Sequence, residues 1–240
     1  MKVEVWLDFV CPFCYIGKRR FESALEKFPH KNNVTVQYKS YELDPYAEVT
    51  PTKNYYELLS NKIGISLEEA KQNAAHIREQ ATTVGLTYHF DTIQPTNTLD
   101  AHRLAIYAAK QHKGNEMTER ILKAHFTDSE HIGEHHLLAK LAAEIGLNID
   151  AVLDFLQTRK YTKVVREDQE LATQIGVKGV PFYVFNEKYA VSGAQPPDVF
   201  SEVLEKVWEE ERDQPYLQSL NSQQPETTYC TDEDCDRNKD

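Results

Sequence analysis

The spacing of apolar positions changes several times along the chain. Residues 2–9 alternate and then run apolar at "WLDFV", which predicts a strand whose end is buried. Apolar residues recur at helical spacing over 12–28, and "NNVTVQYKSYEL" (32–43) alternates again. A strand, a helix and a second strand therefore open the chain as a βαβ unit.

A block without strand signals follows, from about Tyr55 to Thr158. Apolar residues three and four positions apart predict helices over 97–111, 115–126, 134–146 and 150–157. Ser66 and Glu69 have the spacing of a capping box, which begins a further helix. We therefore expect an all-helical insertion over residues 55–157.

Strand signals return after this block. The pattern predicts a helix over 161–176, strands over 180–185 and 188–193 with a tight turn at Asn186-Glu187, and a last amphipathic helix over 198–211. The prediction is an α/β fold, β-α-β … α-β-β-α, with a large helical insertion. Its α/β domain comprises residues 1–54 and 158–211, and residues 212–240 form a flexible acidic tail.

The composition and charge of the chain indicate its compartment and exclude some classes of partner. Hydrophobic residues make up 40% and charged residues 27%, and the apolar runs fall well short of the ~20 residues of a membrane helix. The N-terminus lacks the pattern of a signal peptide, so we expect a cytoplasmic protein. Residues 209–240 hold ten acidic and three basic side chains, and thus −7 of the net charge of −11. This charge balance argues against nucleic acid as a partner.

Two of the four cysteines lie in "CPFC" (11–14), between the predicted first strand and helix. In a reducing compartment, paired cysteines indicate redox catalysis or metal binding. A helix N-terminus directs unpaired N–H groups at Cys11 and favours its thiolate, which is the attacking species. Pro12 fits the first helical turn, and Cys14, one turn on and more buried, can close on a mixed disulfide. The motif therefore predicts thiol–disulfide exchange.

The chain also resembles a known family. "DFVCPFCYIGKRRFE" (8–22) and "GVKGVPFYVFNEKYAVSGAQPPDVF" (176–200) are similar to the DsbA-like branch of the thioredoxin superfamily, and more narrowly to FrnE-like cytosolic oxidoreductases. The resemblance covers about residues 1–211, including "NTLDAHRL" (97–104). It implies a thioredoxin fold and an enzyme whose cysteine pair carries the electrons, without metal or organic cofactor. The implied substrates are protein or small-molecule thiols and disulfides, with glutathione as a candidate co-substrate.

The same resemblance implies a cis peptide at Val180-Pro181, facing the cysteines. Pro181 would shape the facing loop, and the Val180 backbone would pair with an extended substrate. One position departs from strongly oxidising relatives, because Phe13 replaces a histidine that donates to the thiolate. We therefore expect a reduction potential between the ~−120 mV of DsbA and the ~−270 mV of thioredoxin. Partners and compartment would then set the direction of exchange.

Two other functions are compatible with the motif. Cys11 and Cys14, with Cys230 and Cys235, could supply four thiolates to a structural zinc site in a non-catalytic binding protein. Relatives in the superfamily are glutathione-dependent isomerases of small aromatic or polyketide substrates, but those generally lack the cysteine pair.

Outside the motif, "CTDEDC" (230–235) offers either two inert thiols or an auxiliary redox pair. The intervening Asp232, Glu233 and Asp234 would slow attack by these thiols. The nine histidines suggest no metal site: His102 and His125 are expected in packing or on the surface. Aromatic residues of the insertion such as Tyr55, Tyr56 and Tyr88 are expected in the core or along a substrate groove.

Overall fold

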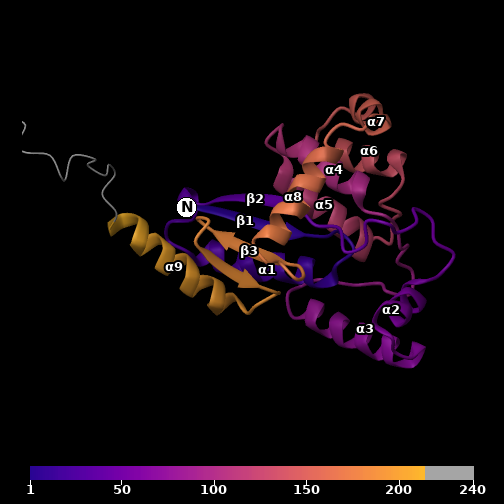
Figure 1. Ribbon diagram of the computed structural model, residues 1–240, viewed down its shortest axis with the longest axis horizontal. Helices are drawn as coiled ribbons and strands as arrows, with labels where there is room; N and C mark the ends of the chain where they lie inside the picture. Colours follow the sequence, from indigo (N-terminus) through magenta and orange to yellow (C-terminus); the bar gives the residue numbers. More distant parts are fainter. Residues whose placement is uncertain (214–240) are drawn as a thin grey trace, which may run out of the picture.

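The computed structural model describes residues 1–213 (Figure 1). In chain order its elements are β1 (Lys2–Leu7), α1 (Pro12–Lys27), the short 3-10 helix η1 (Lys31–Asn33), β2 (Thr35–Ser40), α2 (Tyr55–Ile63), α3 (Leu67–Thr82), α4 (Leu99–Ala109), α5 (Gly114–Phe126), α6 (His135–Glu144), α7 (Ile149–Gln157), α8 (Thr162–Gln174), β3 (Phe182–Phe185), β4 (Tyr189–Ser192) and α9 (Pro197–Asp213). This order confirms the predicted α/β fold with a helical insertion. None of the helices in this part of the chain has the length and apolar character needed to cross a bilayer.

Within the described residues the strands form one sheet in the order β2-β1-β3-β4. β1 is parallel to β2, with Lys2 opposite Thr35, and β3 is antiparallel to both β1 and β4. Three residues, Asn186, Glu187 and Lys188, join β3 to β4, since Phe185 pairs with Tyr189. Asn186 and Glu187 have φ of 48° and 58°, the left-handed conformation of a tight turn, and the Lys188 N–H donates to the Phe185 carbonyl oxygen (3.0 Å). The predicted turn is therefore confirmed, without the usual glycine.

The two faces of the sheet are covered by different helices, because alternate residues of a strand point to opposite faces (Figure 1). Val3 and Val5 of β1 lie in a core with α1 and α9, where the rings of Phe21 and Phe200 are 5.5 Å apart. Trp6 points to the other face and packs against Ala172 of α8. Its indole N–H donates to the Asp168 carbonyl oxygen (2.9 Å), so the ring is buried with its polar atom paired.

The second strand is shorter than the predicted range 32–43. Residues Lys31–Asn33 form η1 instead of extending the strand. At the other end, the Leu43 N–H donates to the Asp8 carboxylate (2.7 Å) rather than to a neighbouring strand. The other elements for which the sequence predicts a range match it to within two residues at each end, the usual variation of element boundaries. The sequence pattern predicts no separate range for α2. The capping box of Ser66 and Glu69 at the start of α3 is also confirmed.

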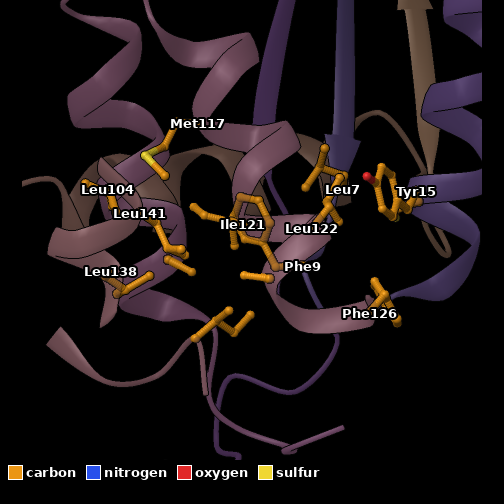
Figure 2. Close-up of a cluster of buried hydrophobic side chains, with 14 of the residues drawn as sticks. Leu7, Phe9, Tyr15, Leu104, Met117, Ile121, Leu122, Phe126, Leu138 and Leu141 are labelled. Atoms are coloured by element: carbon orange, nitrogen blue, oxygen red, sulfur yellow. The ribbon is translucent and has the colours of Figure 1, made fainter. Parts of the chain in front are cut away.

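Helices α2–α7 separate β2 from α8 in sequence, but their core continues into the end of the sheet. Figure 2 shows Leu104, Met117, Ile121, Leu138 and Leu141 of the helices in one cluster with side chains at the end of β1. The residues contributed by the first βα unit are Leu7, Phe9, Cys11, Cys14, Tyr15 and Ile16. The insertion therefore buries the segment that carries the cysteines.

Candidate active site

Cys11 is the N-cap residue of α1, and Pro12 begins the helix. The Cys11 backbone is extended (φ −90°, ψ 111°), and the Cys14 N–H donates to the Cys11 carbonyl (3.0 Å) across the first turn. The Cys11 side chain makes no capping hydrogen bond, so the positive end of the helix remains available to the sulfur. This local geometry follows from a proline at the first helical position, where no N–H is needed.

The site residues predicted in two distant stretches meet in space. The Cys11 Sγ–H donates to the carbonyl oxygen of Val180 (3.4 Å), and the Val180-Pro181 peptide bond is cis. Cys11 is 4% exposed and Cys14 1% exposed, and both are free thiols. Phe13, between them, is 37% exposed. The motif thus presents an aromatic ring to solvent and keeps both sulfurs beneath the surface.

The two thiols differ in their electrostatic surroundings. Burial raises the pKa of the Cys14 thiol well above its usual value. A hydrogen bond to Cys11 and the negative charge of the Cys11 thiolate raise it further. A backbone hydrogen bond from Asp8 acts in the opposite direction on the Cys14 pKa but is the smaller effect. Cys14 is therefore a protonated thiol at neutral pH.

Tyrosines of the insertion approach the motif from the other side. The Tyr88 hydroxyl donates to the Pro12 carbonyl oxygen (2.8 Å), and its ring is 1% exposed. The Tyr55 ring stacks on Phe90 (centroids 4.7 Å apart), and Phe90 in turn packs against Tyr88 (5.5 Å). Tyr56 is different, because its hydroxyl donates to Asp91 at the surface (2.7 Å). Tyr88 thus contacts the motif directly, Tyr55 packs behind it, and Tyr56 lies at the surface.

Asp8 and His102 form a buried polar pair beside the motif that sequence reasoning missed. Asp8 is fully buried, and its Oδ1 lies 3.3 Å from His102 Nε2. His102 was expected in packing or on the surface; it is 2% exposed and comes from α4. The signal in the sequence is Asp8 itself, one acidic residue inside the apolar run "WLDFV" that leads to Cys11. A buried acid is uncommon without a partner or a task.

Two sequence hypotheses are not decided by this geometry. Cys230 and Cys235 lie outside the described residues, so the auxiliary pair and the four-thiolate zinc site remain predictions. Across residues 1–213, no group of three or more histidine, cysteine or acidic side chains is arranged to hold a metal ion. His135 instead bonds to Asp100 through Nε2 (2.7 Å).

Comparison with known protein families identifies the family to which the chain belongs. Residues 2–205 match the model of the DsbA-like thioredoxin domain. The chain belongs to this family. The probable DsbA oxidoreductase SCO1869 from Streptomyces coelicolor is 34% identical, with a TM-score of 0.85 over 92% of this chain and 94% of that chain.

Solved structures of lower identity share the fold. A structure of HCCA isomerase (2-hydroxychromene-2-carboxylate isomerase) is 15% identical, with a TM-score of 0.67 over 89% of this chain and 98% of that one. The cytosolic disulfide reductase DsbM from Pseudomonas aeruginosa, in its structure with GSH, is 16% identical, with a TM-score of 0.62 over 87% of this chain and 100% of that one. At this identity the likeness concerns the fold alone, which serves both redox and isomerase proteins.

Proposed function

We propose that this protein is a cytoplasmic thiol–disulfide oxidoreductase that exchanges disulfides with protein or small-molecule thiols through Cys11 and Cys14. The observation that carries the proposal is the pair itself: Cys11 caps α1, with Cys14 one turn on and the Val180 carbonyl facing the sulfur. An isomerase that uses only the thiolate of glutathione has no need of the second cysteine.

The reaction proceeds in two exchanges. The Cys11 thiolate attacks a substrate disulfide, forms a mixed disulfide and releases the first substrate thiolate. Cys14 then loses its proton and attacks the Cys11 sulfur, which releases the second substrate thiolate and forms the Cys11–Cys14 disulfide. Two electrons pass from the cysteine pair to the substrate, whose two thiolates take up protons. The reverse sequence oxidises a dithiol, and no metal or organic cofactor takes part.

The surface near Cys11 and Cys14 is suited to bind an apolar segment of a substrate. The parallel strands β1 and β2 end at the same edge of the sheet, so the loop after β2 lies beside the cysteines. Large apolar side chains of that loop and of the motif are exposed: Phe13, Leu43, Tyr46 and Val49. Glutathione remains a candidate partner, supported by the DsbM structure with GSH.

Single-cysteine variants test the proposal. All are made in a Cys230→Ser/Cys235→Ser background, so that Cys11 and Cys14 are the only thiols left among the four of the chain. We expect Cys11→Ser to lose turnover of a protein disulfide with glutathione as reductant. In the absence of glutathione, Cys14→Ser mixed with the protein disulfide should accumulate a mixed disulfide, detected as added mass on the intact protein. Full turnover by Cys14→Ser would contradict the proposal, because exchange would then need Cys11 alone.

A further inference from the structure

The hydroxyl of Tyr88 binds the cysteine motif from the helical insertion, in a contact that the proposed exchange does not use. Tyr88 lies between α3 and α4, and its O–H donates to the Pro12 carbonyl oxygen (2.8 Å). The residue is 1% exposed. Burial raises the pKa of Tyr88 far above that of an ordinary tyrosine, so the hydroxyl stays protonated and remains a donor.

The Tyr88 ring is held in place by aromatic neighbours from three segments. It stacks on Phe126 of α5 (centroids 4.7 Å apart) and on Tyr15 of α1 (6.3 Å), and it packs nearly perpendicular to Phe90 (5.5 Å). The backbone of this segment is also fixed to α5, since the His89 N–H donates to the Phe126 carbonyl oxygen (2.9 Å). The packing therefore presents the hydroxyl to the motif in one fixed direction, as a positioning group requires.

The acceptor of this hydrogen bond belongs to the peptide unit that joins Pro12 to Phe13. In a trans peptide the carbonyl and the N–H point in opposite directions, so the Phe13 N–H points back toward Cys11, the N-cap of α1. Across residues 1–213 the Phe13 N–H has no hydrogen-bond acceptor, whereas the Cys14 N–H donates to the Cys11 carbonyl (3.0 Å). Pro12 has no N–H. The Phe13 N–H is therefore the unpaired donor that the first turn directs toward the end of the helix where Cys11 lies.

A hydrogen bond to the carbonyl of a peptide unit strengthens the donor at the other end of that unit. The Tyr88 hydroxyl draws electron density from the Phe13 N–H, and chains of hydrogen bonds gain about 10–30% per bond in this way. A more positive N–H favours the Cys11 thiolate over the neutral thiol. The ionised sulfur can no longer donate to the Val180 carbonyl, as the thiol does (3.4 Å), and becomes an acceptor for this N–H.

We propose that Tyr88 is a positioning residue that stabilises the Cys11 thiolate through the peptide unit between Pro12 and Phe13. The inference rests on the proposed function, in which this thiolate attacks the substrate disulfide. The hydroxyl forms no covalent bond and transfers no proton: the Cys11 sulfur forms the new S–S bond, and the leaving substrate sulfur takes the electron pair. A stabilised thiolate also favours the reduced pair and makes the protein more oxidising.

Removal of this one hydroxyl leaves every ionisable group around the motif in place. Tyr88→Phe keeps the ring and its packing, so a change in the pH dependence of Cys11 reports on the lost hydrogen bond. The ionisable neighbours on the surrounding elements are Asp8 after β1, Cys14 and Tyr15 on α1, Tyr55 on α2, His102 on α4 and His125 on α5.

Tyr15 supplies a matched control for the loss of a buried tyrosine hydrogen bond. It is also 1% exposed and packs in the same aromatic cluster, but its hydroxyl donates to Glu119 on α5 (2.6 Å) instead of to the motif. Because that bond is to a charged group, Tyr15→Phe should lose at least as much stability in urea as Tyr88→Phe. Its redox equilibrium with glutathione should stay within about 1.5-fold of the unsubstituted protein.

The test measures the redox equilibrium in the full chain with Cys230→Ser/Cys235→Ser. The protein is equilibrated with glutathione redox buffers at a pH at which ultraviolet absorbance shows Cys11 as a thiolate. We expect Tyr88→Phe to shift the equilibrium about threefold toward the disulfide, which lowers the reduction potential by about 14 mV.

The rate at which Cys11 attacks dithiodipyridine is then followed from about pH 4 to pH 10. Tyr88→Phe should be slower wherever the thiol is partly protonated, because less thiolate is present. It should be as fast or slightly faster where the thiol is fully ionised, because nucleophilicity rises with the basicity of the thiol. A purely structural role would instead lower the rate by one factor at every pH.

A second variant strengthens the hydroxyl as a donor instead of removing it. Replacement of Tyr88 by a ring-fluorinated tyrosine, which has nearly the same size, should shift the equilibrium toward the reduced pair. This variant also provides the measurement if Tyr88→Phe does not fold.

Three outcomes would overturn the inference. These are equilibria that do not move in opposite directions in the two Tyr88 variants, an equal shift in Tyr15→Phe, or a rate loss in Tyr88→Phe that is the same at every pH. Failure of the proposed function is distinct, because the unsubstituted protein would then form no Cys11–Cys14 disulfide in the glutathione buffers.

Discussion

Phe13 lies between the two cysteines in the sequence, and its ring offers the thiolate no hydrogen bond. We predict that Phe13→His makes the protein more oxidising, because an imidazole N–H next to Cys11 stabilises the reduced, thiolate form. The reduction potential should rise by about 30 mV for each tenfold gain in the equilibrium constant. Equilibration with glutathione redox buffers measures it.

Phe13→Leu is the matched control, because it keeps an apolar side chain at this partly exposed position. Its potential should stay within about 10 mV of the unsubstituted protein, a small fraction of the tenfold step. A similar shift in both variants would mean that the ring's packing, rather than a missing donor, sets the potential.

At the scale of elements, α1 and the loop before β3 approach each other across Gly17. A Cβ added there would lie 2.7 Å from the Tyr183 hydroxyl and 2.9 Å from Pro181 Cγ. We predict that Gly17→Ala lowers the free energy of unfolding by about 1–3 kcal/mol, the usual cost of overpacking. It should also reduce disulfide turnover, because Pro181 must move away from the cysteines.

Gly179→Ala is the comparison, since an added Cβ meets no heavy atom within 4 Å. Its free energy of unfolding should change by less than about 0.5 kcal/mol, as at open sites. Urea unfolding of both variants measures the difference. Equal effects would show that the helix does not depend on close contact with the proline loop.

At the scale of the whole molecule, buried His125 links stability to pH. Burial lowers its folded-state pKa from 6.5 to about 4. Two smaller effects act in opposite directions, since Asp8 raises this pKa and His131 lowers it. The unfolded chain therefore binds a proton near pH 6.5 that the folded chain binds only near pH 4. Stability from this group is complete above about pH 7 and falls as the pH drops, by about 2 kcal/mol between pH 7 and pH 5.

Urea unfolding at pH 7 and pH 5 tests this link. His125→Leu should lose less stability on acidification than the unsubstituted protein, by about 2 kcal/mol. His76→Gln, at a side chain that is 72% exposed, should leave the acid-induced loss unchanged. An unchanged loss in His125→Leu would mean that other groups govern the acid response.

Local patterns predicted much of the scaffold. The alternation of Val3 and Val5 with Glu4 and Trp6 specified two faces of β1, and the capping box at Ser66 specified the start of α3. Such signals depend on neighbours within one turn or one strand, so they can be predicted from the sequence. The pairing of Asp8 with His102 cannot be predicted in this way, because it forms only when α4 packs against the end of β1.

By itself, the sequence determined the order of elements and the placement of "CPFC" between a strand and a helix, because hydrophobic period, capping and proline geometry act locally. The tertiary structure alone decided what surrounds those cysteines. Packing of α4 and α5 against the first βα unit buries Cys14, and the return of the chain in β3 places Val180 at the Cys11 sulfur. Burial raises the pKa of the Cys14 thiol, and the sequence encodes that burial only through the complete fold.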